Sequence, residues 1–371
     1  MTPVQTTREL LLQLVQPATN DEETARLNSL LEQINSLLEQ DLAWDWLLNT
    51  AHEHRVLPLV YQRLAQFPAK VPAPVQTELQ TRYKRSSEFN LGLTGKLLKL
   101  LTLLREHNIP TIAYKGPALA QVVYGDISFR QFTDLDLLIH KSDIRRTKEL
   151  LLANGCQPGW QLTESQEKAV LRHYYAYPFL SNSRRVLIEV HWELTERFFA
   201  YDFAIEQVWQ RAETVKILGK PFRTLSLEDT LLFLCAHGSK HSWKRLGWIC
   251  DVGMLILRRA ELDWEVLTRR ATELGLLRIL WLGTLLADEV FQLPLPAEIR
   301  SRVTGESRLK QLARQTINEM FMGHRSQGTL QSTLFQMSVR ERLRDRFNYC
   351  YRLLVETKLV DSLFMPMGRP R

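Results

Sequence analysis

The sequence predicts an α+β protein in which a small mixed β-sheet is framed by helical regions. Three observations lead to this class. Apolar residues recur at helical spacing through the first hundred residues, short strand-like segments follow up to residue 193, and helical spacing returns after residue 226. We therefore expect an N-terminal helical region over residues 1–90, an α/β core over 91–215 and a C-terminal helical domain over 216–371.

The composition is that of an ordinary globular protein. The 371 residues are 45% hydrophobic and 24% charged, which leaves ample material for buried cores. The formal net charge of +7 favours anionic partners such as nucleotides or RNA. Because many basic proteins bind no nucleic acid, the charge is weak support for such a partner.

No segment has the features of a signal peptide or a membrane span. Met1–Gln13 lacks a basic start, and no stretch reaches the roughly 18 uninterrupted apolar residues that a membrane span requires. The four cysteines have neither metal-ligand nor redox spacing: Cys156, Cys235, Cys250 and Cys350. We expect a cytoplasmic protein with reduced, mostly buried thiols.

The N-terminal region is expected to be helical throughout. Helical spacing of leucines runs from Asp21 to Leu48, and a second helical stretch extends from Trp46 to about Gln66. Phe67–Pro74 contains three prolines and indicates a connector. A long helix is predicted after it, from about Glu78 to His107.

The central region changes to strand-like patterns. Pro110–Lys115 and Thr133–His140 are predicted strands, and Ser142–Asn154 is a predicted helix. Tyr174–Leu180 and Arg185–Glu193 flank a polar turn, which is typical of a hairpin. A mixed α/β unit of about one hundred residues is therefore expected here.

The C-terminal region returns to helical patterns. Ser226 and Asp229 have the spacing of a capping box ahead of the apolar run Leu231–Leu234. Several further helices are expected up to the end of the chain, without internal repeats.

The pair Asp134 and Asp136 is the most informative feature of the sequence. On a strand, alternation sets both carboxylates on one face and Leu135, Leu137 and Ile139 on the other. Two like charges so close are costly unless a cation lies between them. Oxygen ligands favour Mg²⁺ or Mn²⁺. An isolated Asp-x-Asp is more often a solvated strand edge, but the surrounding motifs favour a metal site.

A later acidic strand offers a third metal ligand. Alternation over Ile188–Glu193 sets Glu189, His191 and Glu193 on one face. If this strand lies beside the acidic pair, Glu189 reaches the metal. The alternatives are His191 as the ligand, Glu193 as the carboxylate, or Glu189 as a surface residue.

Two segments before the acidic pair are candidates for binding phosphate. Lys115-Gly116 lies at a strand-to-helix turn, where free N–H groups and the helix dipole favour anions. Pro117 removes one of these donors. Arg130 precedes Asp134 by four residues and is a further candidate. A lysine at a strand end often merely faces solvent, which is the alternative for Lys115.

A histidine-rich segment lies in the first helix of the C-terminal domain. His237 and His241 share a helix face, but no third zinc ligand accompanies them. A structural role, or contact with triphosphate through Lys240 and His241, is the preferred interpretation. Trp243 and Asp251 are expected to be packing or helix-end residues, with base stacking on Trp243 as the alternative.

Five motifs together resemble a known family. They are Lys115–Leu119, Tyr124–Asp126, Arg130–Leu138, Glu189–Trp192 and the run from Glu228 through His237–His241 to Asp251. The chain resembles the bacterial "uncharacterised nucleotidyltransferase" family, a branch of the polymerase-β-like superfamily, from about Trp46 to Pro366. The resemblance implies a nucleotidyltransferase core, with Asp134 and Asp136 as metal ligands and Glu189 as the third carboxylate. The wider superfamily has Gly-Ser or Gly-Gly where this chain has Lys115-Gly116.

The resemblance also implies an activity. A nucleoside monophosphate would pass from an NTP, with ATP the expected donor, to a small-molecule, protein or RNA acceptor by in-line displacement with Mg²⁺ or Mn²⁺. No covalent nucleophile is required. The alternatives are a toxin-like transferase that modifies tRNA and an inactive module that binds nucleotide or a partner protein. The sequence indicates neither the acceptor nor the oligomeric state.

Overall fold

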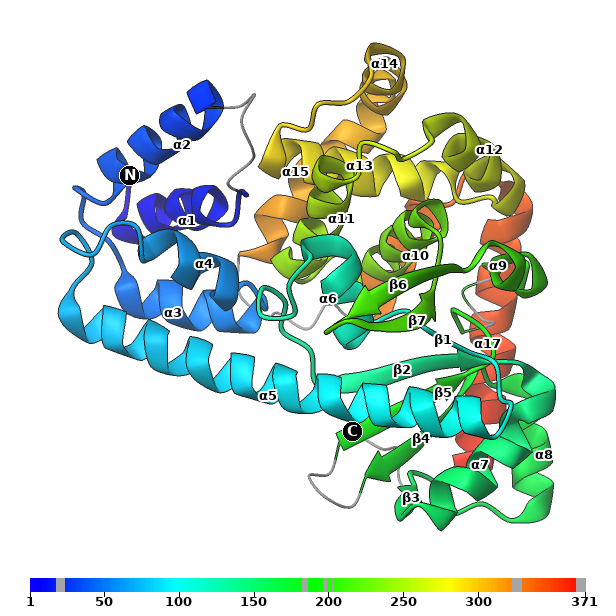
Figure 1. The fold of residues 1–371 in the computed structure, drawn as a ribbon. Helices are drawn as coiled ribbons and strands as arrows, with labels where there is room; N and C mark the ends of the chain where they lie inside the picture. Colours follow the sequence, from blue (N-terminus) through cyan, green and yellow to red (C-terminus); the bar gives the residue numbers. More distant parts are fainter. Residues whose placement is uncertain are drawn as a thin grey trace.

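The computed structural model describes most of the chain (Figure 1). The described residues are 1–17, 24–181, 186–196, 199, 201, 203–321 and 329–364. Among these residues, no helix combines the length and the hydropathy of a membrane span. All four cysteines are free, and two of them, Cys235 and Cys250, are buried.

A seven-stranded mixed sheet forms the centre of the molecule, as the sequence predicts. The strands are β1 (Thr111–Ala113), β2 (Asp134–Ile139), β3 (Cys156–Pro158), β4 (Ala176–Ser181), β5 (Val186–His191), β6 (Glu213–Ile217) and β7 (Lys220–Thr224). Their order across the sheet is β3-β4-β5-β2-β1-β7-β6. The pairs β2–β5 and β1–β7 are parallel and the other pairs are antiparallel.

The predicted strands are confirmed as β1 and β2, and the predicted hairpin as β4 and β5. Residues 182–184 of its polar turn, and Arg185 at the start of the second predicted strand, lie outside the described residues. The sequence interpretation missed β3 and the hairpin β6–β7, whose turn residues Leu218 and Gly219 both have positive φ, as a two-residue hairpin turn requires. Because β7 pairs with β1, the sheet continues beyond the expected boundary at residue 215, which falls within β6.

Helices cover both faces of the sheet. On one face lie α5 (Ala73–Glu106), α7 (Ile144–Ala153) and α8 (Glu164–His173), with α5 running along the sheet in Figure 1. Leu135, Leu137 and Ile139 of β2 pack on that side with apolar residues of α5, as alternation predicts. Leu138 points to the other face and joins the larger helical core. The expected boundary at residue 90 falls inside α5.

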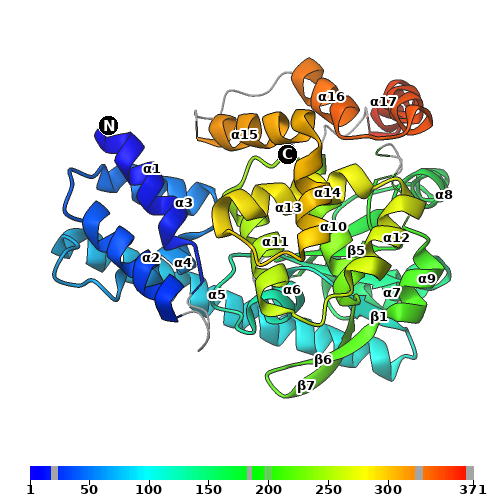
Figure 2. The same cartoon turned by 90° about the horizontal axis from the view of Figure 1, so that it is seen from above.

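The helices of the N-terminal and C-terminal regions form the larger core. Before α5 come α1 (Pro3–Leu14), α2 (Thr24–Leu37), α3 (Trp44–Glu53) and α4 (Leu57–Leu64). The remaining helices are α6 (Gly116–Tyr124), α9 (Ile205–Arg211), α10 (Leu227–Lys240), α11 (Leu246–Arg258), α12 (Trp264–Leu274), α13 (Leu277–Phe291), α14 (Ala297–Gly305), α15 (Ser307–Met320), α16 (Thr329–Ser338) and α17 (Leu343–Phe364). Figure 2 shows α1–α4 at one side of the group formed by α10, α11, α13 and α15.

The capping box predicted for α10 is only half right. The Ser226 hydroxyl accepts a hydrogen bond from the Asp229 backbone N–H, as predicted. The Asp229 carboxylate does not reach back to Ser226 N–H; it forms a two-bond ion pair with Arg211 at 2.9 and 3.0 Å. Tertiary ion pairing therefore replaces the second half of the local motif, because the Asp229 side chain is buried against α9.

His54 joins the N-terminal helices to the C-terminal ones. Its carbonyl accepts a hydrogen bond from Gly247 N–H at 3.0 Å, and its Nδ1 accepts one from Leu246 N–H at 3.1 Å. A Cβ at Gly247 would lie 2.9 Å from that carbonyl, so only glycine permits this approach. The His54 ring also contacts Phe321 beyond α15, with centroids 5.2 Å apart. The end of α3 is thereby fixed against the start of α11.

Glycines allow Trp243 to sit inside the helical core between α10 and α13. Trp243 is fully buried, and a Cβ at Gly238 would lie 2.4 Å from its indole ring, while one at Gly283 would lie 3.2 Å from it. The chain between α10 and α11 is therefore anchored by a large side chain that leaves no spare volume.

The substitution Gly238→Ala is expected to lower the free energy of unfolding by about 1–3 kcal/mol, because the new methyl group overpacks the Trp243 ring. Urea denaturation followed by circular dichroism measures this. The control is Gly95→Ala on the exposed face of α5, where a Cβ meets nothing within 4 Å and helix propensity predicts a gain of about 0.5–1 kcal/mol. Equal behaviour of the two variants would contradict the packing argument.

Candidate functional site

The acidic pair lies at the start of β2. Asp134 is the first residue of the strand and Asp136 the third, so both side chains lie on the face opposite Leu135 and Leu137. Asp136 is 2% exposed, whereas Asp134 is half-buried and lines a large pocket. Burial, followed by the neighbouring charge of Asp136, raises the pKa of Asp134. The pair therefore faces one way, with one member buried and one open to the pocket.

The parallel strand β5 brings further ligands to Asp136. The register pairs Asp136 with Glu189 and Leu138 with His191. As a result, one ligand atom each from Asp136, Glu189 and His191 lie within 4.8 Å of one another. Both Glu189 and His191, which the sequence left as alternatives, thus adjoin Asp136. Neither Asp134 nor Glu193 belongs to this group of described residues.

The two oxygens of Asp136 have different surroundings. Oδ1 accepts a hydrogen bond from Lys115 Nζ at 2.6 Å and lies 3.0 Å from His191 Nε2. Oδ2 is buried without a hydrogen-bond partner among the described residues. Burial alone would raise the pKa of Asp136, but Lys115 and His191 outweigh it and hold the pKa well below its ordinary value. Asp136 is therefore ionised at neutral pH.

Lys115 carries the matching charge. Burial alone would lower the pKa of Lys115, but the charges of Asp136 and Glu189 and the hydrogen bond to Asp136 outweigh it, so the pKa is raised. Lys115 therefore stays protonated and balances part of the negative charge on the strand pair. The alternative of a lysine that merely faces solvent does not describe this side chain, which is 20% exposed.

The residues around Asp136 fit a divalent cation. Two carboxylates and an imidazole provide oxygen and nitrogen donors, and the buried Oδ2 of Asp136 has a lone pair that no described group satisfies. Carboxylates suit Mg²⁺ and Mn²⁺, and an imidazole extends the choice to other transition metals. The donor set is thus compatible with the cation that the sequence predicts.

Gly116 sets the distance between α6 and β2. Its φ is +53°, and a Cβ on it would lie 2.9 Å from the Asp134 carbonyl oxygen. The group that lies close to Gly116 is therefore the backbone of Asp134. The turn Lys115-Gly116 is therefore held directly beside the acidic pair.

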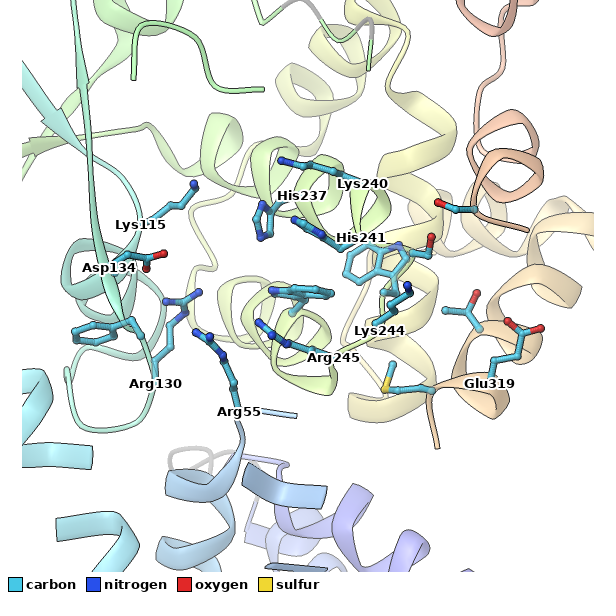
Figure 3. Close-up of a pocket in the computed structure, with 18 of the residues that line it drawn as sticks. Arg55, Lys115, Arg130, Asp134, His237, Lys240, His241, Lys244, Arg245 and Glu319 are labelled. Atoms are coloured by element: carbon cyan, nitrogen blue, oxygen red, sulfur yellow. The ribbon is translucent and has the colours of Figure 1, made fainter. Parts of the chain in front are cut away.

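A pocket of about 1270 Å³ opens beside the acidic pair (Figure 3). Its walls come from α3, the turn before α6, β2, the α10–α11 segment, α15 and α16. The five candidates for binding nucleotide all line it: Lys115, Gly116, Arg130, Lys240 and His241. Its charged lining comprises six basic and two acidic residues: Arg55, Lys115, Arg130, Lys240, Lys244, Arg245, Asp134 and Glu319. A surplus of positive charge in a concave site favours anionic ligands.

Arg130 is held by a buried carboxylate. Its Nε lies 3.0 and 3.1 Å from the two oxygens of Asp251, which also accepts a hydrogen bond from Tyr124 Oη at 2.9 Å. Asn90 of α5 donates to the Arg130 carbonyl at 2.8 Å. Asp251, expected as a packing or helix-end residue, therefore positions a cation of the pocket.

The segment around His237 combines pairing and packing. Lys240 Nζ lies 2.5 Å from Glu196 Oε1, so its charge is already compensated. The rings of His237 and His241 are 4.8 Å apart, and His241 stacks on Trp248 at 5.0 Å. Burial lowers the pKa of His241 to about 3, so this ring is neutral at pH 7. Neither histidine joins a metal-ligand group among the described residues.

The sequence did not predict three basic residues of the pocket: Arg55, Lys244 and Arg245. Arg55 follows α3 with φ +58°, and its N–H and that of Val56 close the helix by hydrogen bonds to His52 and Ala51. Glycine usually occupies this left-handed position, where another residue costs about 1–2 kcal/mol. No motif marks these residues, because only the contact between α3 and α11 brings Arg55 to the pocket.

One known family matches the chain. The pattern of a family described as uncharacterised nucleotidyltransferases matches residues 40–292. The chain belongs to this family. Searches of curated proteins and of solved structures gave no match. The matched segment contains all seven strands and every pocket residue up to Trp248, whereas the pocket wall from α15 and α16 lies outside it.

The protein is expected to lose stability in acid partly through His241. The pKa of His241 is about 3 in the folded protein and 6.5 in the unfolded chain. Below pH 6.5 the unfolded chain therefore binds a proton at His241 that the folded protein does not bind. The contribution of His241 to the free energy of unfolding is fully present above pH 6.5. It decreases as the pH falls below 6.5, by about 1–2 kcal/mol at pH 5.

Urea denaturation at pH 7 and pH 5 tests this. The variant His241→Gln cannot titrate and should lose correspondingly less stability between the two values, since all other groups are the same in both proteins. An identical loss in both proteins would show that His241 is not a buried neutral ring.

Proposed function

We propose that the protein transfers a nucleoside monophosphate from an NTP to an acceptor by metal-dependent in-line displacement. The observation that carries this proposal is the register of β2 and β5, which sets Asp136 beside Glu189 and leaves Asp134 facing a basic pocket. Membership of the nucleotidyltransferase family supports the reaction class.

Each residue of the site has a separate role in the proposed reaction. Asp136 and Glu189 would hold the cation, and Asp134 would join them from the pocket side, although it lies outside the group formed by Asp136, Glu189 and His191. His191 is the alternative third ligand, and its hydrogen bond orients Asp136. These residues would hold a divalent ion, which would supply a lowered pKa for an attacking hydroxyl and a positive charge beside the phosphate being transferred. Lys115 and Arg130 neutralise phosphate oxygens, and the buried Asp251 keeps Arg130 in place for that task. No side-chain nucleophile takes part.

The size of the pocket supports two substrates. Its volume of about 1270 Å³ exceeds the roughly 300–1,000 Å³ typical of a site for one small molecule. A nucleotide, with ATP as the proposed donor, therefore leaves room for part of an acceptor. The remaining space would accommodate a small molecule, a protein side chain or an RNA end as the acceptor.

The substitution Asp136→Asn is expected to lower nucleotidyl transfer by at least about 100-fold, because it removes a charge on which the cation depends. Labelled NTPs, Mg²⁺ or Mn²⁺ and cell extract provide the assay, and circular dichroism checks the fold. Asp126→Asn, an exposed aspartate outside the pocket lining, serves as the control.

The class of labelled product identifies the acceptor. Label in RNA identifies a transferase that modifies RNA, and label in small molecules or protein identifies those acceptors. Full activity in Asp136→Asn refutes the assignment. An absence of transfer, with nucleotide binding that Asp134→Ala leaves unchanged, indicates an inactive binding module.

A second pair of variants tests the third carboxylate. Glu189→Gln is expected to lower transfer by about 10- to 100-fold, since Glu189 lies opposite Asp136, whereas Glu193→Gln should retain most of the activity because Glu193 lies beyond β5. The activity and the Mn²⁺ dependence of both variants are measured. The reverse order of effects would assign the role to Glu193.

A further inference from the structure

Three arginines converge at one end of the pocket. Arg55 comes from the end of α3, Arg130 from the segment before β2, and Arg245 from the residue before α11. In Figure 3 Arg55 extends into the pocket between Arg130 and Arg245, on the side of Asp134 that faces away from Lys115. These three residues are called the arginine cluster, and none of them belongs to the group formed by Asp136, Glu189 and His191.

Two members of the arginine cluster have no compensating charge bound to them. Arg130 is paired with Asp251, but Arg55 and Arg245 form no side-chain hydrogen bond or ion pair with any residue that the structure describes. Arg245 packs over the Trp248 ring at 5.3 Å. The pKa of Arg55 is lowered by burial and next by the charge of Arg245, so the two guanidinium groups repel each other. Asp134 offsets this only in part.

Two hydrogen bonds accepted by His54 keep the two repelling side chains together. His54, which precedes Arg55, accepts from the N–H groups of Leu246 and Gly247, which follow Arg245. The end of α3 and the start of α11 therefore cannot separate to relieve the repulsion without breaking both bonds. The arrangement holds two cations side by side in a half-buried place.

Arg55 carries a second cost. It occupies the left-handed position that closes α3, where glycine is favoured. Arg55 therefore lowers the stability of the fold in two ways, through backbone strain and through repulsion by Arg245. Such conflicts between local preference and residue identity occur at functional sites.

We propose that Arg55 and Arg245 form a phosphate-binding subsite at the junction of the N-terminal helices with α11. A guanidinium group binds phosphate oxygens through two parallel hydrogen bonds, and a dianion between the two groups removes their repulsion. The phosphate belongs either to the NTP or to a phosphorylated acceptor. That choice rests on the proposed function, whereas phosphate binding itself does not.

Inorganic pyrophosphate, titrated calorimetrically into the full chain in EDTA, tests the subsite. Arg55→Gln and Arg245→Gln are each expected to weaken binding by about tenfold or more. The control Arg85→Gln removes the same charge from the exposed surface of α5 and should leave the affinity unchanged. Wild-type affinity in both pocket variants would overturn the proposal.

Excess ATP separates the two sources of phosphate. If ATP abolishes the arginine-dependent binding of pyrophosphate, the subsite takes phosphates of the NTP. If that binding persists with ATP bound, the subsite takes a phosphate of the acceptor. Arginine-independent binding under both conditions contradicts the subsite.

The variant Arg55→Gly distinguishes a binding role from a structural one. It should lose pyrophosphate affinity like Arg55→Gln, yet raise the unfolding midpoint by about 1–2 °C, because strain and repulsion are relieved together. A lower midpoint with unchanged affinity would identify Arg55 as structural.

Pyrophosphate binding in EDTA requires no nucleotidyl transfer, so this measurement keeps the inference separate from the proposed function. If no nucleotidyl transfer is found while pyrophosphate binding depends on Arg55 and Arg245, the proposed function fails and the phosphate subsite stands.

Discussion

The parallel pairing of β2 with β5 is the constraint on which the site depends. A parallel pair in register sets residues with the same orientation directly beside each other, and here it sets Glu189 beside Asp136. A shift of β5 by one residue would turn Glu189 and His191 into the apolar core and bring Ile188 and Val190 to the site. The core on the other face of the sheet, which contains both apolar residues, opposes that shift.

The concentration of negative charge on this strand pair requires compensation. Lys115 supplies one cation to Asp136 at 2.6 Å, and it can do so because Gly116 lets α6 begin against the backbone of β2. The unsatisfied oxygen of Asp136 and the half-buried Asp134 leave further negative charge toward the pocket. The proposed function uses this arrangement of charge. The carboxylates on the sheet would bind the metal ion, and the basic residues around them would bind phosphate.

The pocket is a product of tertiary assembly. Its residues come from segments as far apart as Arg55 and Ser332, and the contacts of His54 with α11 bring the first of them into place. The sequence around Arg55 does not predict this contact, because it does not differ from the sequence around other arginines at helix ends. The same reason explains why Asp251 was expected to be a packing residue, although it holds Arg130.

The sequence by itself determined the helical and strand-like regions, the shared face of Asp134 and Asp136, and the motifs of the nucleotidyltransferase family. These are properties of periodicity and of residue type, which act over a few neighbouring positions. Only the tertiary structure decided that Glu189 and His191 both adjoin Asp136, that Lys115 pairs with it, and that Arg55 reaches the pocket. These depend on strand register and helix docking, which arise from burial of surfaces that are distant in the chain.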